Sequence, residues 1–189
     1  MVNVSVEFDK NKYSDIMRQV SLLANETQIN KAIGRAAKRA ANAARTETVK
    51  QLSSEYTLPV SEMRGTLSTR NLMGGDIGAA MQISSNPFAL PKFEGVTPKE
   101  PVKKPVLAQV KKGSSKLELA RSFAAKMKSG HVGIYERDTD KSLPLGQHFG
   151  PATTGMFKAN EKVNEAVLEK AGETLNKRVI HELERLMYG

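Results

Sequence analysis

The sequence has 189 residues, of which 39% are apolar and only 5% aromatic, and it contains neither cysteine nor tryptophan. The lack of cysteine excludes disulfide bonds, thiolate metal sites and a cysteine nucleophile. A net charge of +9 and a sequence pI near 9.7 favour an acidic partner, of which nucleic acid is the commonest.

The N-terminal sequence contains no basic segment followed by a long apolar run, so we expect no signal peptide. No stretch of the chain approaches the roughly 20 consecutive apolar residues of a membrane span. We therefore expect a soluble protein that is made in a cytoplasm.

The first elements follow from a change of apolar spacing. Valines alternate with polar residues at the start, which predicts a half-buried strand over residues 2–8. Apolar residues then recur at spacings of three and four, which predicts a helix over residues 13–24. Asn25 and Thr27 are candidate N-caps for the helix that follows.

A long helix is predicted from about Thr27 to Ser54, because this segment is rich in alanine and contains no proline. Its apolar face carries Ile29, Ile33, Ala36, Ala37, Ala40 and Ala44. The opposite face carries a narrow polar stripe of Lys31, Arg35, Lys38, Asn42 and Arg45. The cations Lys31, Arg35, Lys38 and Arg45 are a candidate DNA-channel or acidic-partner face. The alternative is a solvated helix surface, and no aromatic residue interleaves the stripe to stack on bases.

The middle of the chain alternates short elements with an irregular stretch. Residues 58–61 predict a short helical turn, and residues 66–84 predict two strands around a turn at Gly74-Gly75. Five prolines and several lysines forbid regular structure in residues 86–105. We expect an extended arm or long loop there, suited to clasping a neighbouring subunit.

The C-terminal half begins with a predicted strand over residues 106–110. Residues 119–127 predict a helical turn that becomes extended from Ser122, and residues 130–135 predict a strand. Residues 143–151 predict a loop. The terminal helix over residues 159–187 is amphipathic, with one apolar face formed by Val163, Val167, Ala171, Leu175, Val179, Leu183 and Leu186.

Together these elements predict an α+β fold in a single domain of residues 1–189. We expect an antiparallel sheet of about five strands, packed by the long N-terminal and C-terminal helices, with the proline-rich arm extending from it.

Little in the sequence predicts catalysis or metal binding. His131, His148 and His181 have no further ligand at metal-ligand spacing, and no nucleophile elbow occurs. Lys112-Gly113-Ser114 ends like a phosphate-binding loop but lacks the upstream glycine. We therefore expect no enzyme activity, no metal and no cofactor.

Two neighbouring motifs carry a resemblance to a known family. The first, from Ser122 to Arg137, contains Phe123, Met127, Gly130, His131, Gly133 and Ile134. The second is Leu143-Pro144-Leu145-Gly146-Gln147-His148-Phe149-Gly150-Pro151. The pair resembles the prophage minor tail protein Z family, in which Phe-x-Ala-x-Met-x-x-Gly-His-x-Gly-Val-Phe-x-Arg precedes Leu-Pro-Ile and then Phe/Tyr-Gly-Pro.

The resemblance extends over about residues 27–188 and departs from the family pattern at two places. Ala152-Thr153-Thr154 stands where the family has Ser-x-Pro, and Gly146-Gln147-His148 replaces the charged residues that normally precede the Gly-Pro. The second departure alters the segment through which partner contacts would be made.

The resemblance implies a structural virion protein that completes the tail of a bacteriophage and helps to join it to the head. The implied partners are further copies of the chain in a ring of six around the DNA channel, and the tail-terminator, tail-tube and connector or neck proteins. The implied location is the head-proximal neck of the tail, after assembly in the host cytoplasm. No membrane contact is implied.

The motif residues have a structural and a docking interpretation. In the first, Gly130 and Gly133 permit close backbone approach, while Phe123, Met127, Ile134, Leu143 and Phe149 fill a core, with His131 as part of the same motif. In the second, a docking loop of Leu143, Pro144, His148, Phe149, Gly150 and Pro151 contacts the next ring. Two other classes stay open: a basic DNA-binding module that uses the helix face from Lys31 to Arg45, and a scaffold or chaperone.

Overall fold

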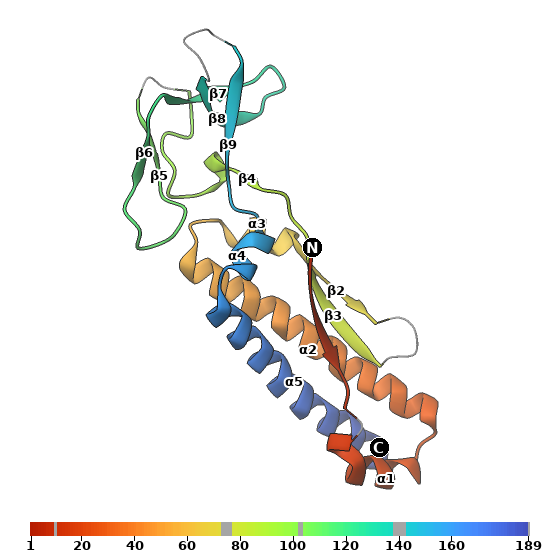
Figure 1. Ribbon diagram of the computed structural model, residues 1–189. Helices are drawn as coiled ribbons and strands as arrows, with labels where there is room; N and C mark the ends of the chain where they lie inside the picture. The colour runs from red at the N-terminus through yellow and green to blue at the C-terminus, as the bar shows by residue number, and fades with distance from the viewer. Residues whose placement is uncertain (10, 73–76, 102–103, 138–142, 189) are drawn as a thin grey trace. The chain divides into compact units, whose positions relative to one another are not determined.

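The computed structural model of the protein describes residues 1–9, 11–72, 77–101, 104–137 and 143–188 (Figure 1). Helices and antiparallel sheets together form the α+β fold that the sequence predicts. The chain divides into two compact units that are interleaved in sequence. The first unit consists of Met1–Val49, Leu67–Ser84 and Phe157–Gly189, and the second of Lys50–Thr66 and Ser85–Met156.

The first unit contains a three-stranded antiparallel sheet in the order β1-β3-β2. Strands β1 (Val2–Glu7), β2 (Leu67–Asn71) and β3 (Gly78–Ile83) confirm the strands predicted for these parts of the chain. The central strand β3 is the most buried, because β1 and β2 pair with it on either side. The predicted turn at Gly74-Gly75 lies outside the described residues.

Two long helices of the first unit begin at asparagine N-caps, of which Asn25 was predicted from the sequence and Asn160 was not. Helix α2 (Glu26–Glu55) starts at a reciprocal capping box, in which Asn25 Oδ1 accepts the Gln28 N–H and Gln28 Oε1 accepts the Asn25 N–H, each at 3.0 Å. Asn160 Oδ1 accepts the N–H of Val163 and so caps α5 (Glu161–Tyr188). The predicted helix over residues 13–24 divides into η1 (Asn11–Tyr13) and α1 (Ser14–Ser21).

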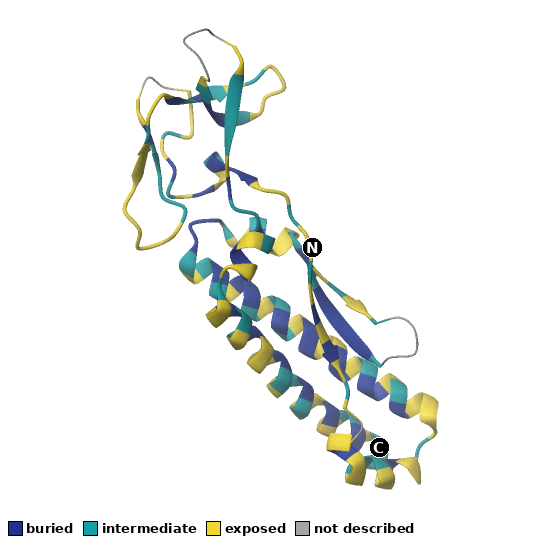
Figure 2. Cartoon of the chain, viewed as in Figure 1, coloured by how far each residue is buried: buried dark blue, intermediate teal, exposed yellow. Residues whose placement is uncertain are grey.

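The core of the first unit is lined by the small residues of α2 (Figure 2). All six residues of its predicted apolar face are buried, and so is every predicted apolar position of α5 except Leu186, which is half-buried. Thr48 is fully buried on α2, and its hydroxyl donates to the carbonyl of Ala44 and lies 3.4 Å from Met81 Sδ of β3. Within the described residues, none of the helices is long and apolar enough to cross a membrane.

The second unit contains short strands and helices. Its larger antiparallel sheet has the order β4-β9-β8-β7, and β5 pairs with β6 separately. The strands are β4 (Phe88–Ala89), β5 (Val106–Ala108), β6 (Leu117–Leu119), β7 (Ser122–Lys126), β8 (Val132–Arg137) and β9 (Leu145–Gly150). The short helices are α3 (Val60–Gly65), η2 (Leu90–Lys92) and α4 (Thr153–Lys158), whose last two residues belong to the first unit.

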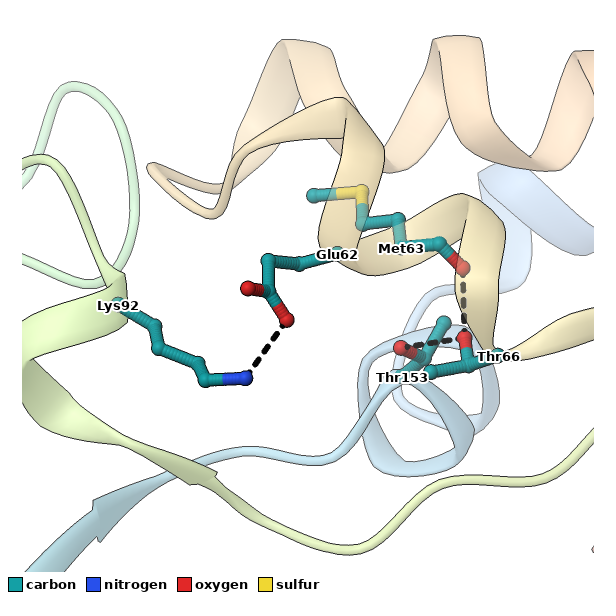
Figure 3. Close-up of polar contacts among 5 residues, drawn as sticks. All are labelled: Glu62, Met63, Thr66, Lys92 and Thr153. Carbon is teal, nitrogen blue, oxygen red and sulfur yellow. Dashed lines mark hydrogen bonds and ion pairs between the residues drawn. The ribbon is translucent and has the colours of Figure 1, made fainter. Parts of the chain in front are cut away.

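Polar contacts hold the short helices of the second unit (Figure 3). The Lys92 ammonium of η2 lies 2.8 Å from Glu62 Oε2 of α3. The Thr66 hydroxyl, just after α3, donates to the Met63 carbonyl at 2.7 Å and lies 3.0 Å from the hydroxyl of the buried Thr153. Because Thr153 begins α4, this contact ties the end of α3 to the start of α4.

Three predictions about the β-structure are wrong. The described strands form sheets of three, four and two strands in place of one sheet of about five. The expected helical turn within residues 119–127 is a β-turn between β6 and β7, in which Arg121 adopts a left-handed φ of 63°. The expected loop over residues 143–151 contains β9, because this segment pairs with both β8 and β4.

The proline-rich segment 86–105 is not an extended arm over its first half. It forms β4 and η2, and the side chains of Leu90, Phe93 and Val96 are buried. Thr97 continues this packing, since its N–H and carbonyl both bond the backbone of Leu107. The prolines prevent long regular elements here, but the apolar residues between them anchor the segment in the core of the second unit.

Candidate functional site

The family-like motif forms a β-hairpin and the strand beside it. Strands β7 and β8 pair along their length, and the turn between them closes with the Gly130 N–H donating to the Met127 carbonyl. Gly130 has a φ of +85°, a left-handed conformation that favours glycine. Strand β9, which carries the second motif, pairs with the other edge of β8. The two motifs are therefore neighbours in one sheet.

Two glycines of the motifs are required by close contacts. A Cβ atom on Gly133 would lie 2.8 Å from ring atoms of Tyr135, and one on Gly150 would overlap the ring of Phe93. Gly150 thus leaves room for an aromatic ring that is fully buried. Gly133 and Gly150 therefore both make room for an aromatic side chain. The predicted close approach of another backbone is not found at Gly133, and a Cβ atom on Gly130 would meet nothing within 4 Å.

The core expected from the motif residues is found only in part. Ile134 is fully buried, whereas Phe123 and Met127 are half-buried. Leu143 and Phe149 are exposed by 68% and 55%, so their assignment to a core is wrong. Phe149 is exposed because it precedes the buried Gly150 on β9, and successive residues of a strand point to opposite faces.

The exposed Phe149 side chain lines an open apolar groove of the second unit, with a volume of about 410 Å³. Leu117 and Leu119 of β6 line the same groove, and Leu117 is 65% exposed. The remaining lining residues are Leu90, Ala108, Val110, Lys111, Ser114, Ser115 and His148. We call this feature the Phe149 groove.

The Phe149 groove only partly matches the predicted docking loop. His148 and Phe149 line it, whereas Leu143, Pro144, Gly150 and Pro151 are not among its lining residues. The leucines of β6 were missed by the sequence analysis. Their alternation at Leu117 and Leu119 is the signal that indicates a strand with one apolar edge.

His148 makes polar contacts that do not form a catalytic triad. Its Nε2 lies 3.1 Å from the Ser122 hydroxyl and 3.0 Å from Glu136 Oε2. A Ser-His-carboxylate triad needs the hydroxyl and the carboxylate on different ring nitrogens, so that one nitrogen accepts the hydroxyl proton while the other is held in place. Here both groups contact the same nitrogen, and the geometry is that of a polar bridge between β7, β8 and β9.

The other two histidines lie apart from this polar bridge. His131 Nε2 accepts from the side-chain amide of Gln147 at 3.0 Å, and His181 is exposed on α5 in the other unit. Within the part of the chain that the structure describes, no three histidine or acidic side chains are placed to hold a metal ion.

The predicted basic stripe of α2 is exposed at Lys31, Arg35 and Lys38, and half-buried at Arg45. Arg35 and Lys38 line a cleft of about 360 Å³ between α2 and α5 in the first unit. Arg39, Asn42, Glu182 and Arg185 complete the lining, whereas Lys31 and Arg45 are not part of it. We call this feature the basic cleft. Neither Arg39 nor Arg185 belongs to the predicted stripe. Arg39 lies beside Lys38 on α2, whereas Arg185 is brought in by the packing of α5, which local spacing does not encode.

Arg35 is joined to Glu182 across the basic cleft. Both Nε and Nη2 of Arg35 approach Glu182 Oε2, at 2.8 and 2.6 Å. Burial alone would raise the pKa of the Glu182 carboxyl. The hydrogen bond and charge of Arg35, together with Arg185 and His181, outweigh the burial and hold this pKa below its ordinary value. Glu182 is therefore ionised at neutral pH and neutralises one of the cations.

Compared with known proteins, the chain matches no protein-family model, no curated protein sequence and no solved structure. The features of the chain that bear on its function are therefore the two motifs, the Phe149 groove and the basic cleft.

Proposed function

We propose that the protein is a structural virion component of a tailed bacteriophage, which completes the tail at its head-proximal end and helps to join it to the head. The resemblance of the two motifs, from Ser122 to Arg137 and from Leu143 to Pro151, to the prophage minor tail protein Z family is the starting point. In this proposal the protein forms a ring of six around the DNA channel, located in the neck of the virion after assembly in the host cytoplasm.

The observation that carries the proposal is the exposure of Phe149 within the second motif. The side chains of Phe149 and of Leu117, which lines the same groove, are both more than half exposed to solvent in the single chain. Burying such a side chain against a partner is favourable by about 1.5–3 kcal/mol. An apolar groove on the strand that carries the family-like motif is typical of a protein that works by assembling with others.

The proposal assigns the partners by position in the tail. Further copies of the chain are neighbours within the ring, whereas the tail-terminator, tail-tube and connector or neck proteins are neighbours along the axis. The Phe149 groove is assigned to an axial contact, because His148 and Phe149 of the predicted docking loop line it.

The test is a complementation experiment in the phage that encodes the chain. Phe149→Ala removes an exposed ring, so the isolated protein should keep the thermal unfolding midpoint of the wild type within a few degrees. We expect full heads and separate tails in electron micrographs of the lysate, because the variant folds but no longer docks.

The matched control is Leu168→Ala, which truncates a side chain that is 57% exposed on α5 of the other unit. This variant should yield infectious particles. Normal infectivity of Phe149→Ala, or failure of Phe149→Ala to fold, contradicts the assignment of docking to this side chain.

A further inference from the structure

We propose that the basic cleft between α2 and α5 binds the phosphate backbone of duplex nucleic acid without sequence preference. This inference goes beyond tail completion and does not rest on it. It uses residues of the first unit only, whereas the proposed docking contact uses the second.

The charge of the cleft favours an anion. Four cationic side chains line it against a single acid, Glu182, which is already engaged with Arg35. Lys38 and Arg39 are exposed, and within the described residues neither forms an ion pair. Clefts lined by one sign of charge concentrate ions of the opposite sign. The cleft therefore keeps a net positive charge on an otherwise open helical surface.

The lining also indicates which kind of anion fits. Among the described residues, no apolar or aromatic side chain lines the cleft. An acidic peptide would therefore find no anchor for its apolar residues there, and a base would find no surface to stack on. Phosphate contacts need only cationic and amide donors, which arginine, lysine and Asn42 supply. The expected binding is therefore electrostatic and independent of sequence.

The spacing along α2 suits a row of phosphates. Lys31 is exposed one turn before Arg35, and it extends the row of cations beyond the cleft. At a rise of about 1.5 Å per residue, the eight steps from Lys31 to Arg39 cover about 12 Å of helix. Phosphates along one strand of DNA advance about 3.4 Å each along the helix axis while winding around it, so a row of this length can reach more than one phosphate.

Glu182 has a positioning role in this site. Its carboxylate occupies the guanidinium of Arg35 from the side of α5, as a phosphate oxygen would. The contact holds Arg35 at the cleft and at the same time cancels one positive charge. Replacing Glu182 by glutamine should free Arg35 for phosphate and tighten binding, which a purely structural role for Glu182 does not predict.

The test measures binding of the full chain to a short fluorescent duplex of mixed sequence, by anisotropy between about 50 and 200 mM salt. We expect weak binding in the micromolar range at low salt that falls steeply as salt rises. The double variant Lys38→Gln and Arg39→Gln should weaken binding roughly fivefold or more per cation and flatten the slope by about 0.9 for each phosphate that is no longer neutralised. Glu182→Gln should tighten binding several-fold.

The matched control is Lys162→Gln, which removes one positive charge from an exposed position near the start of the same α5 helix. It lies twenty residues before Glu182, about 30 Å along the helix, and should leave affinity and slope unchanged. An equal loss in this control, absence of binding at low salt, or unchanged affinity in Glu182→Gln overturns the proposal. A last outcome concerns competition for the fluorescent duplex. If polyglutamate displaces it as effectively as an unlabelled duplex of equal charge does, the cleft binds acidic peptides and the proposal is overturned.

Discussion

Gly150 is the residue of the second motif whose structural role is clearest. Phe93 comes from the proline-rich segment, is fully buried, and lies where a Cβ atom of residue 150 would be. Two neighbouring residues of β9 in the Phe-Gly-Pro sequence therefore have different environments. Phe149 is exposed toward the groove, whereas Gly150 is kept small by the core beneath it.

We expect Gly150→Ala to lower the free energy of unfolding by about 1–3 kcal/mol, because the added methyl group overlaps the Phe93 ring. Urea unfolding followed by circular dichroism measures the change. Gly155→Ala is the control, since its Cβ would meet nothing within 4 Å in α4 and alanine favours a helix by about 0.5–1 kcal/mol. Equal stability of Gly150→Ala and the wild type would rule out the contact with Phe93.

At the scale of elements, the ion pair between Arg35 and Glu182 joins the two long helices of the first unit. The pKa of Glu182 is lower in the folded protein than its ordinary value of 4.5. The folded state therefore binds this proton less readily than the unfolded chain does. The stability that the Arg35–Glu182 pair contributes is fully present above the pKa that Glu182 has in the unfolded chain. It is lost as the pH falls through the lower pKa that Glu182 has in the folded protein.

We expect Glu182→Gln to reduce stability by roughly 0.5–1 kcal/mol at neutral pH, because Arg35 is partly exposed and the pair is screened by water. The difference between variant and wild type should shrink as the pH falls below about 4.5, the ordinary value. Thermal unfolding at a series of pH values measures this. The exposed Lys170–Glu173 pair provides the control, in which Glu173→Gln changes little. If the difference in stability between Glu182→Gln and the wild type stays constant with pH, the ion pair between Arg35 and Glu182 does not stabilise the fold.

The helices of the protein follow from its sequence more closely than its strands. The long helices are marked by alanine content, apolar spacing and the caps Asn25 and Asn160, all of which are local signals. Strand β9 depends on pairing with β8 and β4, which lie elsewhere in the chain, and its glycines and Pro144 favour a loop when considered alone.

The candidate sites show the same division between local and long-range information. The basic stripe of α2 was predicted because its members share one helix face, yet Arg185 joins it only through the packing of α5. The exposure of Phe149 could not be predicted, because it depends on which side of β9 faces the core. Periodicity identifies faces within an element, but it does not say which elements meet.

At the scale of the whole molecule, the chain crosses between its two units four times: within α2, between residues 66 and 67, between residues 84 and 85, and within α4. Neither unit is therefore a continuous segment, and the description as a single domain stays a prediction. The two proposals use two surfaces, the apolar Phe149 groove in the second unit and the basic cleft in the first. The proposed role, in which the protein assembles with others close to DNA, would use both surfaces.

The measurement that tests tail completion most directly is electron microscopy of lysates from a phage with a nonsense codon early in this gene. The proposed function predicts full heads beside separate tails of normal length, because only the junction lacks a component. A suppressor strain that restores the protein should restore joined particles. Tails that are missing or of the wrong length contradict the proposal, and so do heads without DNA.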